Sequence, residues 1–334
     1  MPVKLARVNA AKTLIGTSSM HKTDPSSANN SLENPRPKGP EIASFPVRSA
    51  DLGGGLSVER ALPLRQQRLV GAWCFADHFG PLNFHDRKIM DVAPHPHMGL
   101  QTVSWLLDGE VLHHDSLGFT AEVRPGELNL MTAGRAIAHS EETPVRNSGR
   151  IHGLQLWVAL PDNERQRQPG FDHYPELPVL EPGGGRVRLF MGELAGVRSP
   201  ARAFSPIVGA EVTLGSNAGM NLPLNPAWEH ALLIIEGTML LDGKPLPTGA
   251  LHYLGTGRSG IEMRCKRPVR AVLIGGAPFG ESILIWWNFV ARTVEEIRQA
   301  REDWEQHLRF GEVLAYRGER LKAPSFSVRP LNSG

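Results

Sequence analysis

Short segments in which bulky apolar residues alternate with smaller or polar ones recur along the chain from about residue 45. In "QTVSWLL", residues 101–107, the bulkier set stands at every second position, at Val103, Trp105 and Leu107. Such alternation is typical of a β-strand that turns one face to a core. Asp108–Gly109 follows at once and is a common hairpin turn. With 35 glycines and 27 prolines along 334 residues, the pattern predicts many short strands joined by turns.

A single segment near the end of the sequence has clear helical periodicity. In "TVEEIRQAREDWEQHLRF", residues 293–310, apolar residues recur every three or four positions and form one stripe. Thr293 stands where an N-cap is expected, and Glu296 completes a capping box three residues later. The sequence therefore predicts one helix beside a chain that is otherwise β.

Two pairs of segments are similar to each other across the chain. "WLLDGEV" (residues 105–111) is similar to "LIIEGTM" (233–239), and "PGELNLMTAG" (125–134) is similar to "TGALHYLGTG" (248–257). A strand–turn–strand unit that occurs twice in the same order indicates two duplicated β-domains. The polar, turn-rich residues 161–171 form a natural connector between them.

Charge and cysteine content exclude several classes of protein. The 36 Lys and Arg residues are balanced by 34 Asp and Glu residues, so no general attraction to nucleic acid or to a membrane surface is expected. No apolar run approaches the length of a membrane span. Two cysteines, Cys74 and Cys265, cannot form a disulfide framework and fit a reducing compartment. We therefore expect a cytoplasmic protein, or a nuclear one in a eukaryote, with no direct nucleic-acid or membrane partner.

Two short pairs of metal-competent residues carry the chemistry of the chain. "HPH" places His95 and His97 two residues apart, and "HSE" gives the same spacing to His139 and Glu141. Residues two apart on a strand point to the same face, so two strands can bring three imidazoles and one carboxylate together. Such a set suits a divalent transition metal and leaves coordination positions open.

The second copy of the repeat lacks this set. At the positions that correspond to the four residues, it holds Pro223, Asn225, Glu262 and Arg264. Residues that the scaffold needs for folding should be present in both copies. Their confinement to one copy therefore favours a functional site.

Four stretches of the sequence resemble the pirins, a branch of the cupin superfamily. They are "DHFGP" (77–81), "HPHMGLQTVSWLLDGEVLHHDSLG" (95–118), "RPGELNLMTAGRAIAHSE" (124–141) and "ESILIWWNFVARTVEEI" (281–297). The resemblance extends from about residue 46 to 311. It implies an all-β bicupin, in which two antiparallel jelly-roll β-barrels lie face to face, with a short C-terminal helix.

This resemblance and the composition together give the expected domains. Residues 1–45, rich in Ser, Asn, Pro and Lys, are expected to form a disordered tail. Residues 46–165 would form an N-terminal, metal-binding cupin barrel, and residues 186–290 a C-terminal cupin barrel without metal. Residues 291–334 would contribute the helix and a C-terminal tail. The resemblance also favours a monomer.

The resemblance implies one metal, Fe(II) before Mn, Ni, Co, Cu or Zn, held by His95, His97, His139 and Glu141. Pirins are associated with quercetin 2,3-dioxygenase activity, in which dioxygen cleaves the heterocyclic ring of a flavonol and carbon monoxide is released. The substrates would then be a small, flavonol-like aromatic molecule and dioxygen, with Glu141 as the catalytic base for the 3-hydroxyl proton. Four side chains are candidates for the wall of the substrate pocket: Met98, Gln101, Trp105 and Met131.

Two other functions stay open at this point. The family also includes proteins reported to bind transcription factors or metabolic enzymes, with iron as a redox switch, and this predicts a protein partner. The third function is another cupin activity on the same metal, a different dioxygenation or an isomerisation, because a fold alone does not fix the chemistry.

Overall fold

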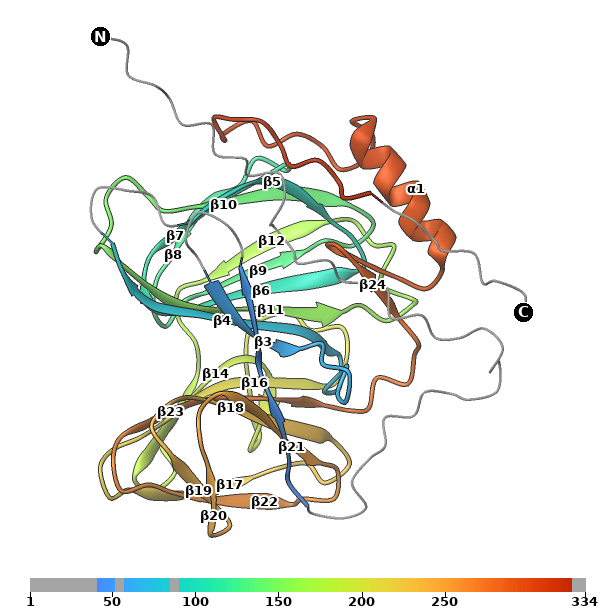
Figure 1. Cartoon of the computed structure of the whole chain (residues 1–334). Helices are drawn as coiled ribbons and strands as arrows, with labels where there is room; N and C mark the ends of the chain where they lie inside the picture. The colour runs from blue at the N-terminus through green and yellow to red at the C-terminus, as the bar shows by residue number, and fades with distance from the viewer. Residues whose placement is uncertain (1–40, 52–56, 85–89, 326–334) are drawn as a thin grey trace.

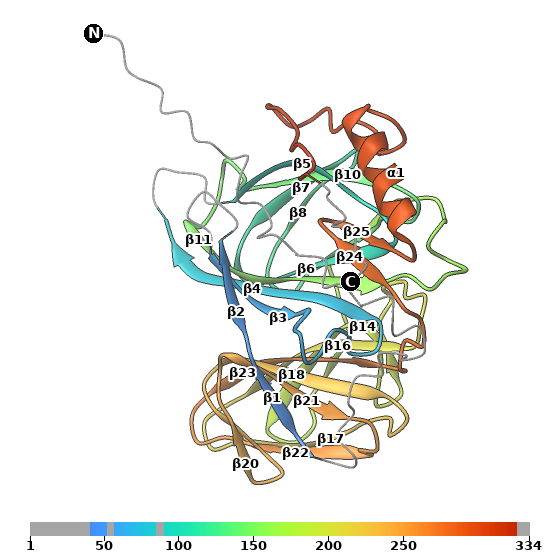
Figure 2. The same cartoon turned by 45° about the vertical axis from the view of Figure 1, so that its right-hand side comes forward.

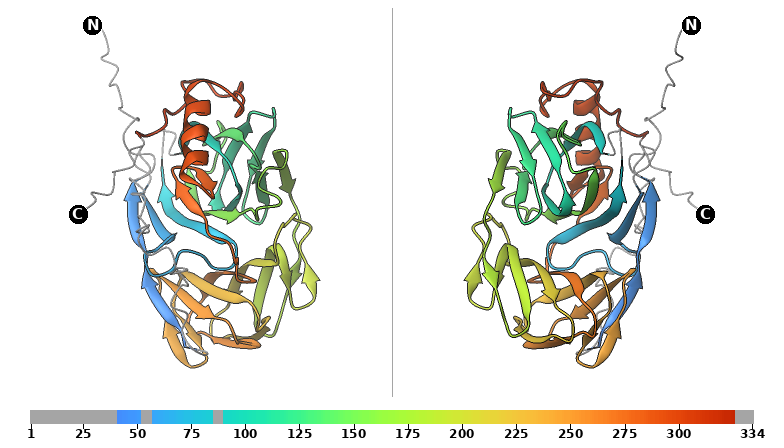
Figure 3. Two further views of the ribbon diagram at one scale, coloured as in Figure 1. Left: turned by 90° about the vertical axis from the view of Figure 1, so that its right-hand side faces the viewer. Right: turned by 90° about the vertical axis from the view of Figure 1, so that its left-hand side faces the viewer.

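The computed structural model of this chain describes residues 41–51, 57–84 and 90–325. It consists of two stacked β-barrels and one helix that lies beside the N-terminal barrel (Figure 1; Figure 3). Every strand pair in the sheets is antiparallel, as the alternation and the hairpin turns predict. Residues 1–40 of the predicted tail lie outside the described part of the chain.

Two sheets form the N-terminal barrel. The large sheet has the order β12-β9-β6-β11-β4-β3-β2 and comprises β2 (Arg48–Asp51), β3 (Ser57–Leu62), β4 (Trp73–Asn83), β6 (Leu100–Gly109), β9 (Leu128–Thr132), β11 (Arg150–Ala159) and β12 (Gly170–Tyr174). The small sheet has the order β5-β10-β7-β8 and comprises β5 (Asp91–His97), β7 (Val111–Asp115), β8 (Thr120–Val123) and β10 (Ile137–Glu142).

The C-terminal barrel repeats this plan. Its large sheet has the order β1-β21-β18-β23-β16-β14-β13, with β15 paired to β14, and comprises β1 (Ala43–Pro46), β13 (Val179–Leu180), β14 (Gly185–Leu194), β15 (Val197–Arg198), β16 (Ile207–Leu214), β18 (Glu229–Glu236), β21 (Ala250–Gly255) and β23 (Val269–Gly276). Its small sheet, β17-β22-β19-β20, comprises β17 (Gly219–Pro223), β19 (Met239–Leu241), β20 (Lys244–Leu246) and β22 (Gly260–Arg264).

The sequence repeat corresponds to equivalent places in the two barrels. Strands β6 and β9 are neighbours in one large sheet, and β18 and β21 are neighbours in the other. The prediction of an all-β chain with two duplicated barrels is therefore confirmed. The interior of the second barrel is apolar where the first holds its histidines, since the buried side chains of β17 and β22 are Met220, Leu222, Ile261 and Met263. Glu262 and Arg264, which correspond to His139 and Glu141 in the sequence repeat, pair with each other at the surface.

The main core of the molecule lies between the two large sheets. Side chains of both barrels form one buried cluster there, among them Trp73, Trp105, Leu156, Phe190, Leu233 and Ile274. The two indoles also reach across with hydrogen bonds. Trp73 Nε1 donates to the carbonyl oxygen of Val208 (3.0 Å), and Trp105 Nε1 donates to Glu211 Oε2 (3.1 Å). The barrels are thus joined by apolar contact and by satisfied polar groups.

Segments near both ends of the chain pair with a different part of the fold from the one expected. The domain boundaries therefore differ from those expected. Strand β1 (Ala43–Pro46), expected in the tail up to residue 45, pairs with β21 of the C-terminal barrel, and Arg48–Asp51 continues into the N-terminal barrel (Figure 2). The N-terminal barrel extends beyond residue 165, because β12 pairs with β9. The hairpin of β24 (Leu284–Trp286) and β25 (Phe289–Ala291), expected in the C-terminal barrel, contacts the N-terminal one, where Val290 N donates to the carbonyl oxygen of Met98 (3.0 Å).

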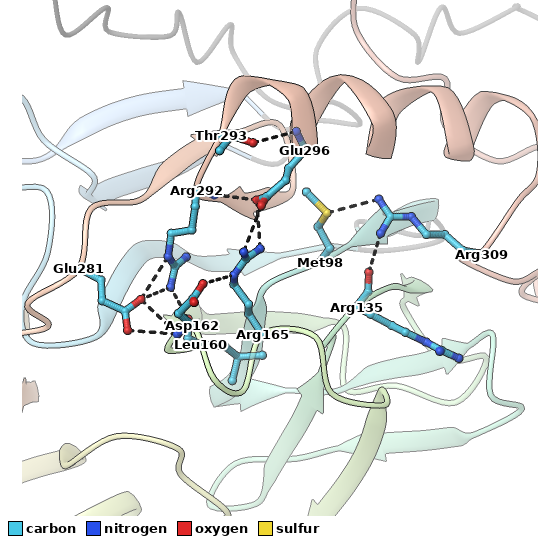
Figure 4. A network of polar contacts seen from close by, with 10 residues as sticks. All are labelled: Met98, Arg135, Leu160, Asp162, Arg165, Glu281, Arg292, Thr293, Glu296 and Arg309. Carbon is cyan, nitrogen blue, oxygen red and sulfur yellow. Dashed lines mark hydrogen bonds and ion pairs between the residues drawn. The ribbon is translucent and has the colours of Figure 1, made fainter.

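The helix α1 (Val294–Glu305) begins where predicted and ends five residues earlier than expected. Thr293 Oγ1 accepts a hydrogen bond from Glu296 N (3.2 Å), as expected for the N-cap (Figure 4). The Glu296 carboxylate in turn accepts two hydrogen bonds from Arg165 (3.0 and 3.1 Å), which fixes the first turn of the helix to the N-terminal barrel. The helix stops because His307 adopts the left-handed conformation (φ 59°).

None of the helices in the described part of the chain combines the length and the hydropathy that a membrane span requires.

Candidate metal centre

Three histidines of two paired strands converge inside the N-terminal barrel. Strand β10 pairs with β5 in a register that sets His139 opposite His95 and Ile137 opposite His97. One donor atom from each of His95, His97 and His139 lies within 4.8 Å of the other two. The ring centroids of the three imidazoles are 4.4 to 5.0 Å apart. The spacing of two residues therefore brings these side chains together as predicted.

Burial keeps the three imidazoles neutral. Their relative exposures are 7, 2 and 1 % for His95, His97 and His139. Loss of solvation lowers the pKa of His95 to about 4 and holds the pKa of His97 and His139 well below the usual value. For His97 and His139 the proximity of His95 acts in the same direction. A neutral imidazole offers the lone pair that a metal needs.

The unpaired nitrogens of this triad fit a metal ion. Among the described residues, Nε2 of His139 has no hydrogen-bond partner, and the ring nitrogens of His97 have no close one beyond a backbone contact with Asn288, although both side chains are buried. Buried polar atoms are seldom left unsatisfied in folded proteins. Three neutral nitrogens that point into one space suit a divalent transition metal.

A chain of hydrogen bonds behind the triad assigns the proton positions on His139. The Asp115 carboxylate Oδ2 lies 3.2 Å from Nε2 of His113, and Nδ1 of His113 lies 3.3 Å from Nδ1 of His139. Because a carboxylate only accepts, His113 carries its proton on Nε2 and accepts a proton from His139 at Nδ1. Nε2 of His139 then carries no proton, and its lone pair is free to bind a metal. His95 is oriented similarly, since its Nδ1 donates to the carbonyl oxygen of Ala93 (2.9 Å).

Glu141 lies in the same barrel but outside the 4.8 Å group of donor atoms. The pairing of β10 with β5 is irregular between His139 and Glu141, so the two side chains are not simple neighbours on one face. Ser104 Oγ donates to Glu141 Oε1 (3.2 Å) and orients the carboxylate. Burial raises the pKa of Glu141, and His113 and Ser104 oppose this shift.

A cavity opens beside His95 and Glu141, and most of its wall is aromatic or apolar. The other lining residues are Arg60, Phe75, Asp77, Phe79, Met90, Val92, Gln155, Trp157, Trp287, Asn288 and Leu321. Sequence reasoning missed these residues. The strings "DHFGP" and "WWNF" contain four of them, Asp77, Phe79, Trp287 and Asn288, but nothing local indicates that they face the histidines.

The four side chains expected at the pocket lie elsewhere. Trp105 faces the second barrel, and Gln101 is buried on the same face, where it donates to Thr132 Oγ1 (2.9 Å) and to the carbonyl oxygen of Arg202 (3.1 Å). Met98 packs against the β24–β25 hairpin, and its sulfur accepts from Arg309 Nη2 (3.7 Å; Figure 4). Met131 belongs to a buried apolar cluster of the first barrel. The bulky face of β6 is the interface face, which is why the expectation for Gln101 and Trp105 differs from the structure.

Two barrels, each built from a large and a small antiparallel sheet, with a histidine triad in the first, define a bicupin. The chain belongs to the pirin family. The pirin family model matches residues 55–158, and the model of the pirin C-terminal cupin domain matches residues 209–311.

Several relatives share most of their length with this chain. A Pseudomonas aeruginosa protein named putative quercetin 2,3-dioxygenase PA1205 is 45% identical over 279 residues, which cover 83% of this chain and 88% of the relative. Human pirin is 34% identical over 273 residues, 77% of this chain and 89% of that protein. A crystal structure of quercetin 2,3-dioxygenase from Acinetobacter baumannii has 43% sequence identity and a TM-score of 0.82, covering 86% of this chain and 96% of the other.

Proposed function

We propose that this protein is a metal-dependent dioxygenase that cleaves a flavonol of the quercetin type. The observation that carries the proposal is the buried, neutral triad of His95, His97 and His139, with unpaired nitrogens on His97 and His139, beside an aromatic cavity. The 45% identity to a protein named as a putative quercetin 2,3-dioxygenase gives independent support.

The residues that would hold the metal are His95, His97 and His139, with Glu141 as a fourth ligand. We propose Fe(II) as the native ion. When bound, such a metal supplies Lewis acidity and open positions for a substrate oxygen and dioxygen.

The side chains of the cavity account for substrate binding and proton transfer. Trp157 and Trp287 line the cavity with aromatic surface that can contact the rings of an aromatic substrate. Glu141 is the base that takes up the proton of the 3-hydroxyl group, because burial raises its pKa and makes its protonated form accessible. Ser104 holds the carboxylate in place through its hydrogen bond (3.2 Å).

Dioxygen uptake with quercetin tests the proposal. The protein would be purified without oxygen and reconstituted with Fe(II), beside the variants His97→Ala and His114→Ala. His114 is a matched control, because it is a buried histidine whose Nδ1 pairs with Thr120 Oγ1 instead of joining the triad. Oxygen uptake with release of carbon monoxide, lost in His97→Ala and kept in His114→Ala, is the expected result.

Absence of turnover in fully metal-loaded protein would refute the dioxygenase function. A metal-dependent protein partner, as in a regulatory module, would then be the function to test by pull-down with and without metal. The expected monomer stays a prediction that sedimentation can test.

A further inference from the structure

One wall of the metal cavity carries an ion pair that the proposed reaction does not use. Arg60 on β3 and Asp77 on β4 are cross-strand partners, and both line the cavity with His95 and Glu141. The contact is bidentate: Arg60 Nε donates to Asp77 Oδ1 (2.8 Å), and Nη2 donates to Oδ2 (2.7 Å). The side chains are 13 % and 3 % exposed, so the pair is largely shielded from bulk water.

Two aromatic side chains separate this pair from the histidine triad. The guanidinium carbon of Arg60 lies 4.6 Å from the ring centroid of Phe75. Phe75 stacks on Trp157, with centroids 4.0 Å apart and an interplanar angle of 17°. Trp157 contacts His97 edge to face at 5.3 Å. This stack leads from the triad to the ion pair along one side of the cavity, so a substrate held by one oxygen at the triad can reach Arg60 and Asp77 past the edges of these rings.

The pair has hydrogen-bonding capacity left for a ligand. The bidentate contact uses Nε and Nη2, so Nη1 of Arg60 remains as a donor that Asp77 does not occupy. Each carboxylate oxygen of Asp77 can accept a second hydrogen bond. A hydroxyl group both donates and accepts, so it can bind to the two partners at once. Stability alone does not explain the pair, because a buried ion pair adds little compared with apolar side chains of similar volume.

We propose that Arg60 and Asp77 form a hydroxyl-recognition site, which binds a ring hydroxyl of the substrate remote from the oxygen held at the triad. The site restricts the substrate class to polyhydroxylated aromatic molecules. The proposal rests on the proposed function for the identity of the aromatic substrate. Arg60 and Asp77 determine specificity and take no part in the proton transfer assigned to Glu141.

Calorimetric titration under anaerobic conditions tests the site without turnover. The probes are quercetin and 3-hydroxyflavone, which share the 3-hydroxyl and the neighbouring carbonyl, while only quercetin carries further ring hydroxyls. Hydrogen bonds to charged groups predict that Fe(II)-loaded wild-type protein binds quercetin about 10- to 100-fold more tightly. Arg60→Met should bring the ratio of the two Kd values close to one.

Arg270→Met is the matched control. Arg270 Nε donates to Glu211 Oε1 (2.6 Å) in another partly buried ion pair, and neither residue lines the cavity. This variant should keep the wild-type ratio. If Arg60→Met does not fold, Asp77→Asn provides the test, because it keeps the shape of the side chain. It should lower the ratio of the two Kd values about tenfold.

An unchanged ratio in a folded Arg60→Met or Asp77→Asn variant overturns the site, and so does equal affinity of the wild-type protein for the two flavonols. Oxygen uptake decides the proposed function separately. Selective binding of quercetin without turnover would refute the dioxygenase function and support the hydroxyl-recognition site. Turnover of both flavonols with equal affinity would support the dioxygenase function and refute the site.

Discussion

Asp115→Asn is expected to weaken metal binding although Asp115 is not a metal ligand. In the wild-type protein, Asp115 Oδ2 accepts from Nε2 of His113, and this sets the proton of His139 on Nδ1. An asparagine presents either an acceptor or an NH₂ group at that position. Asp115 Oδ1 already accepts from Leu117 N (2.9 Å) and Phe119 N (3.0 Å), so the new amide keeps its oxygen there and turns its NH₂ group towards His113.

The reversed hydrogen bonds place a proton on the wrong atom. His113 would accept at Nε2 and donate from Nδ1, and His139 would then carry its own proton on Nε2, the atom whose lone pair the metal needs. Changes of this kind behind a metal ligand typically reduce metal affinity 10- to 100-fold. This corresponds to about 1.4 to 2.7 kcal/mol of binding free energy.

The assay is a competitive titration of Fe(II) against a chelator of known affinity, without oxygen. Asp108→Asn is the control, since Asp108 lies away from the triad, where Oδ1 accepts from Gly109 N (2.9 Å) and Oδ2 pairs with Arg150 Nε at the surface (3.1 Å). His113→Leu should lower affinity by a similar factor, and Asp115→Asn should add little in the double variant, because both changes interrupt one chain of hydrogen bonds. Wild-type affinity in Asp115→Asn, or additive losses in the double variant, would refute the reasoning.

Three further predictions concern other parts of the molecule. Glu141→Gln should lower the rate of flavonol turnover about 10²- to 10⁴-fold at saturating metal, as oxygen uptake would show, because the base is lost; a rate near that of the parent would exclude Glu141 as the base. Trp105→Phe should lower the free energy of unfolding in urea by about 1–3 kcal/mol, because the hydrogen bond to Glu211 between the barrels is lost. Metal content should stay unchanged, and a variant as stable as its parent would contradict this role. Burial lowers the pKa of His230 to about 4, so the unfolded state takes up a proton more readily below the ordinary pKa of 6.5. The stability of the metal-free protein should therefore fall as the pH decreases from 6.5 towards 4, by at most about 1.4 kcal/mol per pH unit for this residue, and chemical denaturation should show a smaller slope in His230→Gln.

The sequence predicted the triad because its signal is local. Residues two apart on a regular strand lie on one face, and His95 and His97 follow this rule. His139 and Glu141 depart from it, because the pairing of β10 with β5 is irregular between them. The apolar stripe and the cap at Thr293 predicted the helix for the same reason. The helix end was less certain in advance, since it depends on the backbone conformation of His307.

The pocket wall could not be predicted in this way. Both faces of the large sheet are buried, one in the barrel interior and one against the second barrel, so a bulky face such as that of Trp105 does not reveal which space it fills. The chain also brings Trp287 and Asn288 to the histidines from far along the sequence. Such contacts depend on topology, and periodicity contains no information about them.

The hairpin that carries Trp287 and Asn288 has a consequence for biosynthesis. The histidine triad is complete once residue 139 has been made, but a wall of its cavity is added about 150 residues later in the chain. At the other end, Ala43–Pro46 pairs with β21 and must wait for residues 250–253. The three histidines are therefore synthesised well before the hairpin that lines one side of their cavity. A chain that ends at β23 would lack Trp287 and Asn288 and therefore one wall of the cavity beside the triad.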